Sequence, residues 1–260
     1  MSVTNHQHSV LLERVFSLIN EKVDNGDAPL IQQFGRLLYK NMSFEDINGR
    51  SDSDLYGATL SLWQLMQTFH VGTPCIKVFN PEIAKHGWQS SHTIIEIIVK
   101  DMPFLVDSVR MAINRFGIAA HLLLHSPMHV TRNQDNKVTG FVDSKSKSTK
   151  YSSETVFLIE IDRQAKRSDI EKLRAELLSV VDEVSLSVSD WQPMREKLAT
   201  ITKSFEGSKS VASSAIKAQG KTFLNWLNDH NFTLMGYRYY QVKAIQGDHR
   251  WIPENDSSLG

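Results

Sequence analysis

The sequence has little of several features that commonly reveal what a protein does. Its one cysteine, Cys75, excludes an internal disulfide and any metal site built from several cysteines. The 29 basic and 29 acidic residues balance to a formal net charge of zero, so no basic field exists to attract nucleic acid. No apolar run approaches the roughly 18–20 residues that a membrane-spanning helix needs, and the N-terminus lacks a secretory signal pattern. We therefore expect a cytoplasmic protein whose partners are neither nucleic acid nor a membrane.

Known catalytic motifs are absent as well. The chain has no H-E-x-x-H sequence, no glycine-rich phosphate loop and no nucleophile elbow. Of its 10 histidines, His121, His125 and His129 are spaced so that all three lie on one face of a predicted strand. Strand residues four apart are ~13 Å apart, too far to share one zinc ion. The sequence thus predicts no catalytic residue, no metal site and no cofactor bound by this chain.

Residues 1–72 are predicted to form a helical segment. Apolar residues recur at helical spacing in residues 9–23, 27–39 and 51–69, and Ser9, Asp27 and Ser51 are suitable N-cap residues. We expect the apolar faces of these helices to pack against a neighbouring domain or another subunit.

Strands dominate the next part of the chain. Residues 75–80 and 92–100 are predicted strands that could pair as a hairpin across a long loop, and the second is apolar on both faces, as in a central strand. The Asp-Met-Pro sequence at residues 101–103 ends it. A helix is expected over residues 103–116, with Asp101 as the favoured N-cap and Gly117 as the left-handed C-terminal cap. Further strands are predicted at residues 118–133, 137–142 and 154–162.

The part of the chain from Ser168 onward is expected to be mainly helical and then to form a hairpin whose first strand is rich in aromatic residues. From Ser168 an apolar stripe at helical spacing favours one long helix bent near Pro193, although residues 184–188 also alternate as in a strand. Residues 206–214 have the composition of a linker. A helix over residues 217–229 and an aromatic strand over residues 232–242, with a hairpin partner at 245–252, follow. A two-stranded ribbon alone is marginally stable, which indicates the start of an incomplete domain at residues 206–260.

One place in the sequence could accept a ligand. The junction at residues 101–108 should offer free N–H groups at a helix N-terminus, which can bind the carboxylate of a small molecule. The alternative is that Asp101 and Asp107 simply stabilise the helix through its dipole.

Several stretches together resemble a known family. The sequence DMPFLVDSV, followed by a helix and the strand IAAHLLLHS, resembles the N-terminal region of the large bacterial NAD-dependent glutamate dehydrogenases. The stretches FNPEIAKHGWQSSHTIIEI, VSLSVSDWQPM and FLNWLNDHNFTLMGYRYY agree with this, so the resemblance covers the chain from about Leu55 onward.

The resemblance implies an α+β fold in which residues 73–205 form an ACT-like domain, with the ferredoxin-like βαββαβ order and an antiparallel sheet. Its first strand would be residues 92–100, and its second helix would begin at Ser168. The last strand could come from residues 184–188, from residues 232–242 or from a partner chain.

The resemblance also implies a function. This chain would be a non-catalytic regulatory and assembly region, and NAD and the oxidation of L-glutamate would belong to the parent enzyme downstream. The junction at residues 101–108 is a corner between a strand and a helix. This corner matches the loop where many ACT domains bind their ligand, with Phe104 in place of the usual glycine. Two alternatives are an amino-acid-sensing module and a purely structural oligomerisation module. Expected partners are downstream domains of the same chain, further copies in a homo-oligomer and an amino-acid effector. The implied effector-binding residues are Asp101, Met102, Pro103, Phe104, Asp107 and Ser108.

Overall fold

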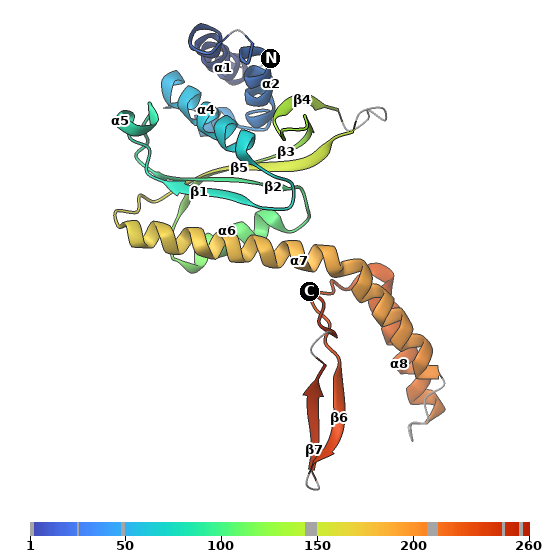
Figure 1. Ribbon diagram of the computed structural model, residues 1–260. Coiled ribbons are helices and arrows are strands. Elements are labelled where there is room, and N and C mark those ends of the chain that lie inside the picture. The colour runs from blue at the N-terminus through green and yellow to red at the C-terminus, as the bar shows by residue number, and fades with distance from the viewer. Residues whose placement is uncertain are drawn as a thin grey trace. The chain divides into compact units, whose positions relative to one another are not determined.

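The computed structural model describes residues 3–24, 26–47, 50–143, 150–206, 213–245, 248–254 and 257–260. They form two compact units, Met1–Val181 and Asp182–Gly260. The first unit contains a five-stranded antiparallel sheet with helices on both faces (Figure 1). This confirms the predicted α+β class. The domain boundaries expected at 72/73 and 205/206 stay predictions.

The sheet has the strand order β1-β2-β5-β3-β4. Strand β2 lies inside it and is buried over all but its last residue, because β1 and β5 flank it and helices cover both of its faces. This confirms the prediction made from its apolar run. The strands are β1 (Cys75–Phe79), β2 (Thr93–Lys100), β3 (Ala120–Arg132), β4 (Val138–Val142) and β5 (Ser152–Ile161).

The edge position beside β2 is filled by a strand that precedes it in sequence. In a βαββαβ fold this place belongs to the last strand, but here β1 takes it, paired antiparallel from Cys75 with Ile98 to Phe79 with Ile94. The predicted hairpin is therefore confirmed. Residues 184–188 are helical, so their assignment to the last strand is wrong. Of residues 232–242, the last three belong to β6 in a separate two-stranded sheet, and Tyr237 forms an isolated bridge with Leu259.

The first face of the sheet is covered by the N-terminal helices (Figure 1). Ser51 caps the third of the predicted helices, where its hydroxyl accepts the Asp54 N–H at 3.0 Å. Ser9 is not a cap, because the first helix already begins at Val3, and Asp27 makes no side-chain capping bond. These helices and the sheet share one hydrophobic core. They are α1 (Val3–Lys22), α2 (Ala28–Leu38), α3 (Phe44–Ile47) and α4 (Asp52–Thr68); the four-residue α5 (Ile83–His86) lies between β1 and β2.

The second face is covered by α6 (Leu105–Arg115) and the start of α7 (Arg167–Glu206). The apolar stripe expected for α6 is buried from Leu105 to Ile113, but Phe116, expected to be its last buried member, is 40% exposed. Gly117 adopts the left-handed conformation expected after the helix, with a φ of 67°. A single 40-residue helix confirms the favoured prediction for the segment after Ser168, and Pro193 lies inside it.

The second unit contains the rest of α7 and three further elements. These are α8 (Ser214–Trp226), the π-helical turn η1 (Leu227–Asn231) and a hairpin of β6 (Tyr240–Ile245) and β7 (Asp248–Pro253). The hairpin was predicted, but its first strand begins at Tyr240 rather than at Phe232. Most of the predicted linker, residues 207–212, lies outside the described residues. Among the described helices, none combines the length and the apolar character needed to cross a bilayer.

Candidate functional site

The predicted corner is built differently from the sequence expectation. Asp101 is not an N-cap: its N–H donates to the Ser153 carbonyl at 2.9 Å, and its carboxylate accepts the Thr155 hydroxyl at 2.7 Å. Strand β5 thus holds this side chain, and α6 begins only at Leu105. The assignment of Asp101 as the cap is wrong because a hydroxyl 54 residues away competes for its carboxylate.

Phe104 occupies the N-cap position in a left-handed conformation, with φ 71° and ψ −7°. A non-glycine residue there carries a cost of roughly 1–2 kcal/mol. Its side chain is 49% exposed. Ser108 donates its N–H to the Phe104 carbonyl at 3.0 Å, so this donor already serves the helix. Met102 is half-buried, and Pro103 and Asp107 are exposed, so the corner forms an open surface rather than a cleft.

His125 and His129 lie on one sheet face, as predicted, but the strand register shifts between Ala120 and Leu122, and His121 contacts His92 and Asp162 instead. Burial lowers the pKa of His125, while a nearby Asp101 acts in the opposite direction. Within the described residues no three metal-ligating side chains gather to hold an ion. The histidines have separate partners: His121 with Asp162 at 2.7 Å, His125 with Thr155 at 3.4 Å and His129 with Ser153 at 3.1 Å.

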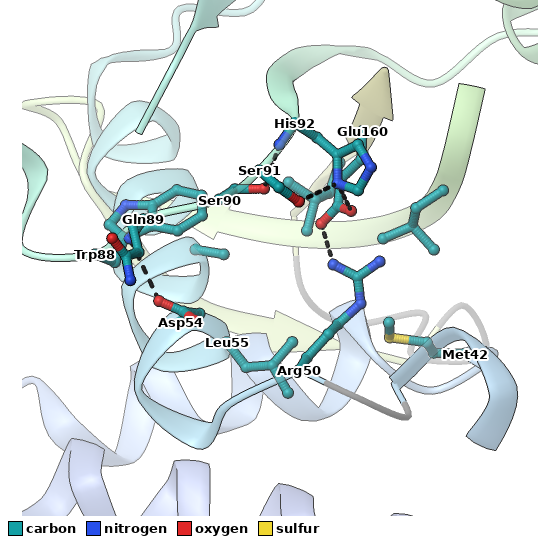
Figure 2. A pocket seen from close by; sticks show the side chains of 13 residues that line it. Met42, Arg50, Asp54, Leu55, Trp88, Gln89, Ser90, Ser91, His92 and Glu160 are labelled. Atoms are coloured by element: carbon teal, nitrogen blue, oxygen red, sulfur yellow. Dashed lines mark hydrogen bonds and ion pairs between the residues drawn. The ribbon is translucent and has the colours of Figure 1, made fainter. Parts of the chain in front are cut away.

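A cavity of about 280 Å³ lies elsewhere in the first unit, where the start of α4 and the loop before β2 meet the first face of the sheet (Figure 2). This cavity was not predicted from the sequence. Its lining residues are Met42, Arg50, Asp54, Leu55, Ala58, Trp88, Gln89, Ser90, Ser91, His92, Leu122, Leu158 and Glu160.

The polar end of this cavity is organised around Glu160 on β5. Its side chain is only 6% exposed, and its Oε1 forms an ion pair with the Arg50 guanidinium. Figure 2 shows Arg50 and His92 both directed at this carboxylate. Oε2 lies 3.4 Å from His92 Nδ1 and has no hydrogen-bond partner among the described residues. Arg50 is held in turn by the Asp46 carbonyl, which accepts its Nε–H at 2.6 Å.

The walls of the cavity come from close packing of α4 against the loop that follows α5. Trp88 is buried directly on Gly57, where a Cβ would lie 2.4 Å from its ring. At the rim, Asp54 accepts the Gln89 N–H at 3.3 Å. Leu122 and Leu158 form an apolar floor. The cavity therefore has a charged end and an apolar end, a combination suited to a small amphipathic molecule.

Sequence periodicity could not join Arg50, His92 and Glu160, because the first and last are 110 residues apart. One signal was available. In the apolar strand sequence ETVFLIEID, Glu160 follows the same alternation as the inward-facing Val156 and Leu158. A glutamate that points into the core needs a cationic or hydrogen-bonding partner. That pattern would have indicated a buried charge, although not its partners.

A second glutamate is buried on the same face of the sheet, outside the cavity. The side chain of Glu96 on β2 is fully buried, and Lys77 Nζ is the cation nearest to it, 3.7 Å from Oε2. Burial raises the pKa of this carboxyl, and the neighbouring Lys77 partly opposes that effect.

The strand order, with two helices across one face, defines an ACT-like α+β domain carrying a helical segment on its other face. Comparison with protein families gives a match over residues 34–177, from within α2 to within α7. On this evidence the chain belongs to the family described as glutamate dehydrogenase, ACT1 domain.

Two curated relatives resemble the chain over most of its length. A protein of Halomonas elongata named NAD-specific glutamate dehydrogenase is 34% identical over 251 residues, which is 96% of this chain and 16% of that protein. A protein of Pseudomonas aeruginosa with the same name is 33% identical over 232 residues, 89% of this chain and 14% of that protein. The chain thus spans less than a fifth of the length of these relatives.

Proposed function

We propose that this chain is the N-terminal regulatory and assembly region of an NAD-dependent glutamate dehydrogenase. The observation that carries the proposal is the ACT1 family match, together with relatives named as this enzyme. In the proposed parent, NAD binding and the conversion of L-glutamate, NAD and water to 2-oxoglutarate, ammonia and NADH belong to downstream domains. This region acts in the cytoplasm and is itself non-catalytic.

Exposed apolar side chains in the second unit support the assembly role. Phe223, Trp226, Phe232 and Trp251 are each about half exposed or more. These side chains lie on α8, directly after η1 and on β7, and large exposed aromatic groups mark protein contacts where they cluster. We assign them to contacts with the downstream domains of the same chain.

The test is a matched pair of variants in the full-length parent enzyme. We expect Trp251→Ser to lower the thermal stability of the enzyme or to shift its oligomer mass in light scattering, because it removes an apolar contact. Arg250→Ser changes an exposed polar residue on the same strand and should leave both properties unchanged. Equal behaviour of the two variants and the unmodified enzyme would contradict the proposal.

A second candidate role is effector binding at the corner formed by Asp101, Met102, Pro103, Phe104, Asp107 and Ser108. The backbone of Phe104 supports it, because a φ of 71° is the left-handed geometry that a glycine would adopt at this turn. If the corner binds an amino acid, Phe104→Gly should strengthen binding by removing the side chain from the approach path. Calorimetry with a panel of amino acids tests this, and an absence of heat with both the variant and the unmodified chain would refute it.

A further inference from the structure

We propose that the cavity lined by Arg50, His92 and Glu160 is a binding site for a small zwitterion, namely an α-amino acid with an apolar side chain. The site is separate from the corner at Asp101, and the inference does not depend on the proposed function. It rests on three features of the cavity: an unsatisfied buried acceptor, an incompletely used guanidinium and an apolar floor.

The unsatisfied acceptor is Glu160 Oε2. A buried carboxylate oxygen without a hydrogen bond carries a substantial desolvation cost, so most such groups in folded proteins have a partner. Here Glu160 lines the cavity, and its Oε2 forms no hydrogen bond within the described residues, although His92 Nδ1 lies 3.4 Å away. A ligand ammonium group would donate to it and relieve that cost.

The guanidinium of Arg50 provides the complementary half. Within the part of the chain that the structure describes, it uses one terminal nitrogen for Glu160 and its Nε for the Asp46 carbonyl. Arginine has five N–H donors in a planar fork, which leaves further donors for a ligand carboxylate. Arg50 lines the same cavity as Glu160, so both charged groups of an α-amino acid can be met at one end.

Charge balance favours a zwitterion over a simple ion. Glu160 and Arg50 already neutralise each other in a partly buried setting. A ligand with one charge would leave an uncompensated charge beside this pair, which is costly in a buried site. A zwitterion adds no net charge. Its ammonium group would lie beside Glu160 and its carboxylate beside Arg50, so each charge would have a neighbour of opposite sign.

The remaining space defines the body of the ligand. The volume of about 280 Å³ lies just below the range of roughly 300–1,000 Å³ typical of drug-sized ligands, so the occupant is a small metabolite. Leu55, Leu122 and Leu158 face this space and would accept an aliphatic side chain. Leucine, valine and methionine have this form.

Calorimetry on the 260-residue chain tests the proposal with L-leucine, L-valine and L-methionine as probes. Isopentylamine lacks the carboxylate of leucine, and 4-methylpentanoate lacks its ammonium group. Each analogue should bind roughly 10- to 100-fold more weakly than L-leucine, because each loses one charge-assisted contact. Equal binding of the amino acid and an analogue would overturn the zwitterion assignment.

Variants then locate the site. Glu160→Gln should weaken binding of L-leucine at least tenfold. Glu96→Gln is the matched control, because it changes another buried glutamate on the same sheet face outside the cavity. Ala58→Leu fills the cavity without altering a charge and should abolish binding even if Glu160→Gln folds poorly. Asp101→Asn lies at the corner and should leave binding unchanged.

The indole N–H resonance of Trp88 gives a local readout, since Trp88 lines the cavity and the buried Trp63 does not. L-leucine should shift the Trp88 signal and leave the Trp63 signal in place. Absence of both heat and a Trp88 shift with all three amino acids would refute the proposal. So would binding that Asp101→Asn abolishes and Ala58→Leu leaves intact, which would place the ligand at the corner.

Discussion

Breaking the buried ion pair between Arg132 and Glu154 by removing one partner is expected to destabilise the first unit strongly. Arg132 ends β3, and its Nε and Nη2 donate to the two carboxylate oxygens at 2.8 and 2.7 Å. The side chains are 7% and 0% exposed, respectively. The guanidinium also donates to the carbonyls of Met66 at 3.2 Å and Asn136 at 2.8 Å, so it joins the sheet to the end of α4.

Arg132→Met is the informative perturbation, because methionine fills similar space but cannot donate a hydrogen bond. It would leave the Glu154 carboxylate buried without its cation. Breaking a buried pair in this way costs about 3–5 kcal/mol, a large part of the roughly 5–15 kcal/mol that stabilises a typical domain. At about 2–4 °C per kcal/mol for a unit of this size, the melting temperature should fall by about 6–20 °C.

Urea unfolding followed by circular dichroism measures this cost. Arg167→Met is the matched control, because Arg167 pairs with Glu171 at 2.7 Å while the two side chains are 91% and 62% exposed. An exposed pair contributes about 0–1 kcal/mol, so the control should unfold almost as the unmodified chain does. The double variant Arg132→Met with Glu154→Leu removes the buried charge and should recover most of the loss. A loss below about 1 kcal/mol in Arg132→Met, or a double variant no more stable than that single one, would refute the reasoning.

Three further substitutions test other parts of the first unit by urea unfolding. Burial raises the pKa of Glu96, so its ionisation destabilises the fold as the pH rises above the usual glutamate value; Glu96→Gln should therefore stabilise at about pH 8 and have little effect at about pH 4. Gly57→Ala should destabilise by about 1–3 kcal/mol through overlap with Trp88, despite a helix-propensity gain of about 1 kcal/mol; Gly26→Ala meets open space and should not destabilise. Phe104→Gly should be about 1 kcal/mol more stable than Phe104→Ala, because only glycine relieves the left-handed strain. A flat pH dependence, a neutral Gly57→Ala or equal Phe104 variants would each contradict its prediction.

Local pattern was sufficient to predict the part of the fold around β2 and α6. The apolar run of β2, the stripe from Leu105 to Ile113 and the cap at Gly117 each act over a few residues, so the sequence carries them directly. The long helix α7 was also predicted. Its stripe includes Leu173 and Leu177, which are fully buried, and this periodic burial outweighs the short alternation at residues 184–188.

Contacts distant in sequence decided what local pattern missed. Asp101 has the chemistry of an N-cap, but Thr155 on the neighbouring strand binds its carboxylate, and the turn then continues to Phe104. The strand β1 and its pairing with β2 were predicted, but its place at the edge expected for the last ACT-like strand was not. An ACT-like order suggests a strand after the second helix, whereas β1 reaches the same edge from the other direction along the chain. A strand can pair antiparallel with β2 whether it precedes or follows β2 in the sequence.

The candidate cavity depends on the same long-range register. Ile94 and Leu122 both lie opposite Glu160 in the sheet, which brings the start of β2 and the start of β3 to one carboxylate. Arg50 reaches this point from the connection before α4. Sequence reasoning placed its only ligand site at residues 101–108 because a helix start is visible locally, and a cavity assembled from three segments is not.

Three buried glutamates on the first face of the sheet explain why the helical segment matters to it. Glu154 is neutralised within the sheet by Arg132, and Glu96 has Lys77 of the adjacent strand nearby. Glu160 depends instead on Arg50, which precedes α4, so the helical segment supplies a counter-charge as well as an apolar cover. A buried carboxylate deprived of its cation is strongly destabilising. The Arg50–Glu160 contact therefore both links the helical segment to the sheet and shapes the polar end of the cavity. A ligand bound there would act directly on this link.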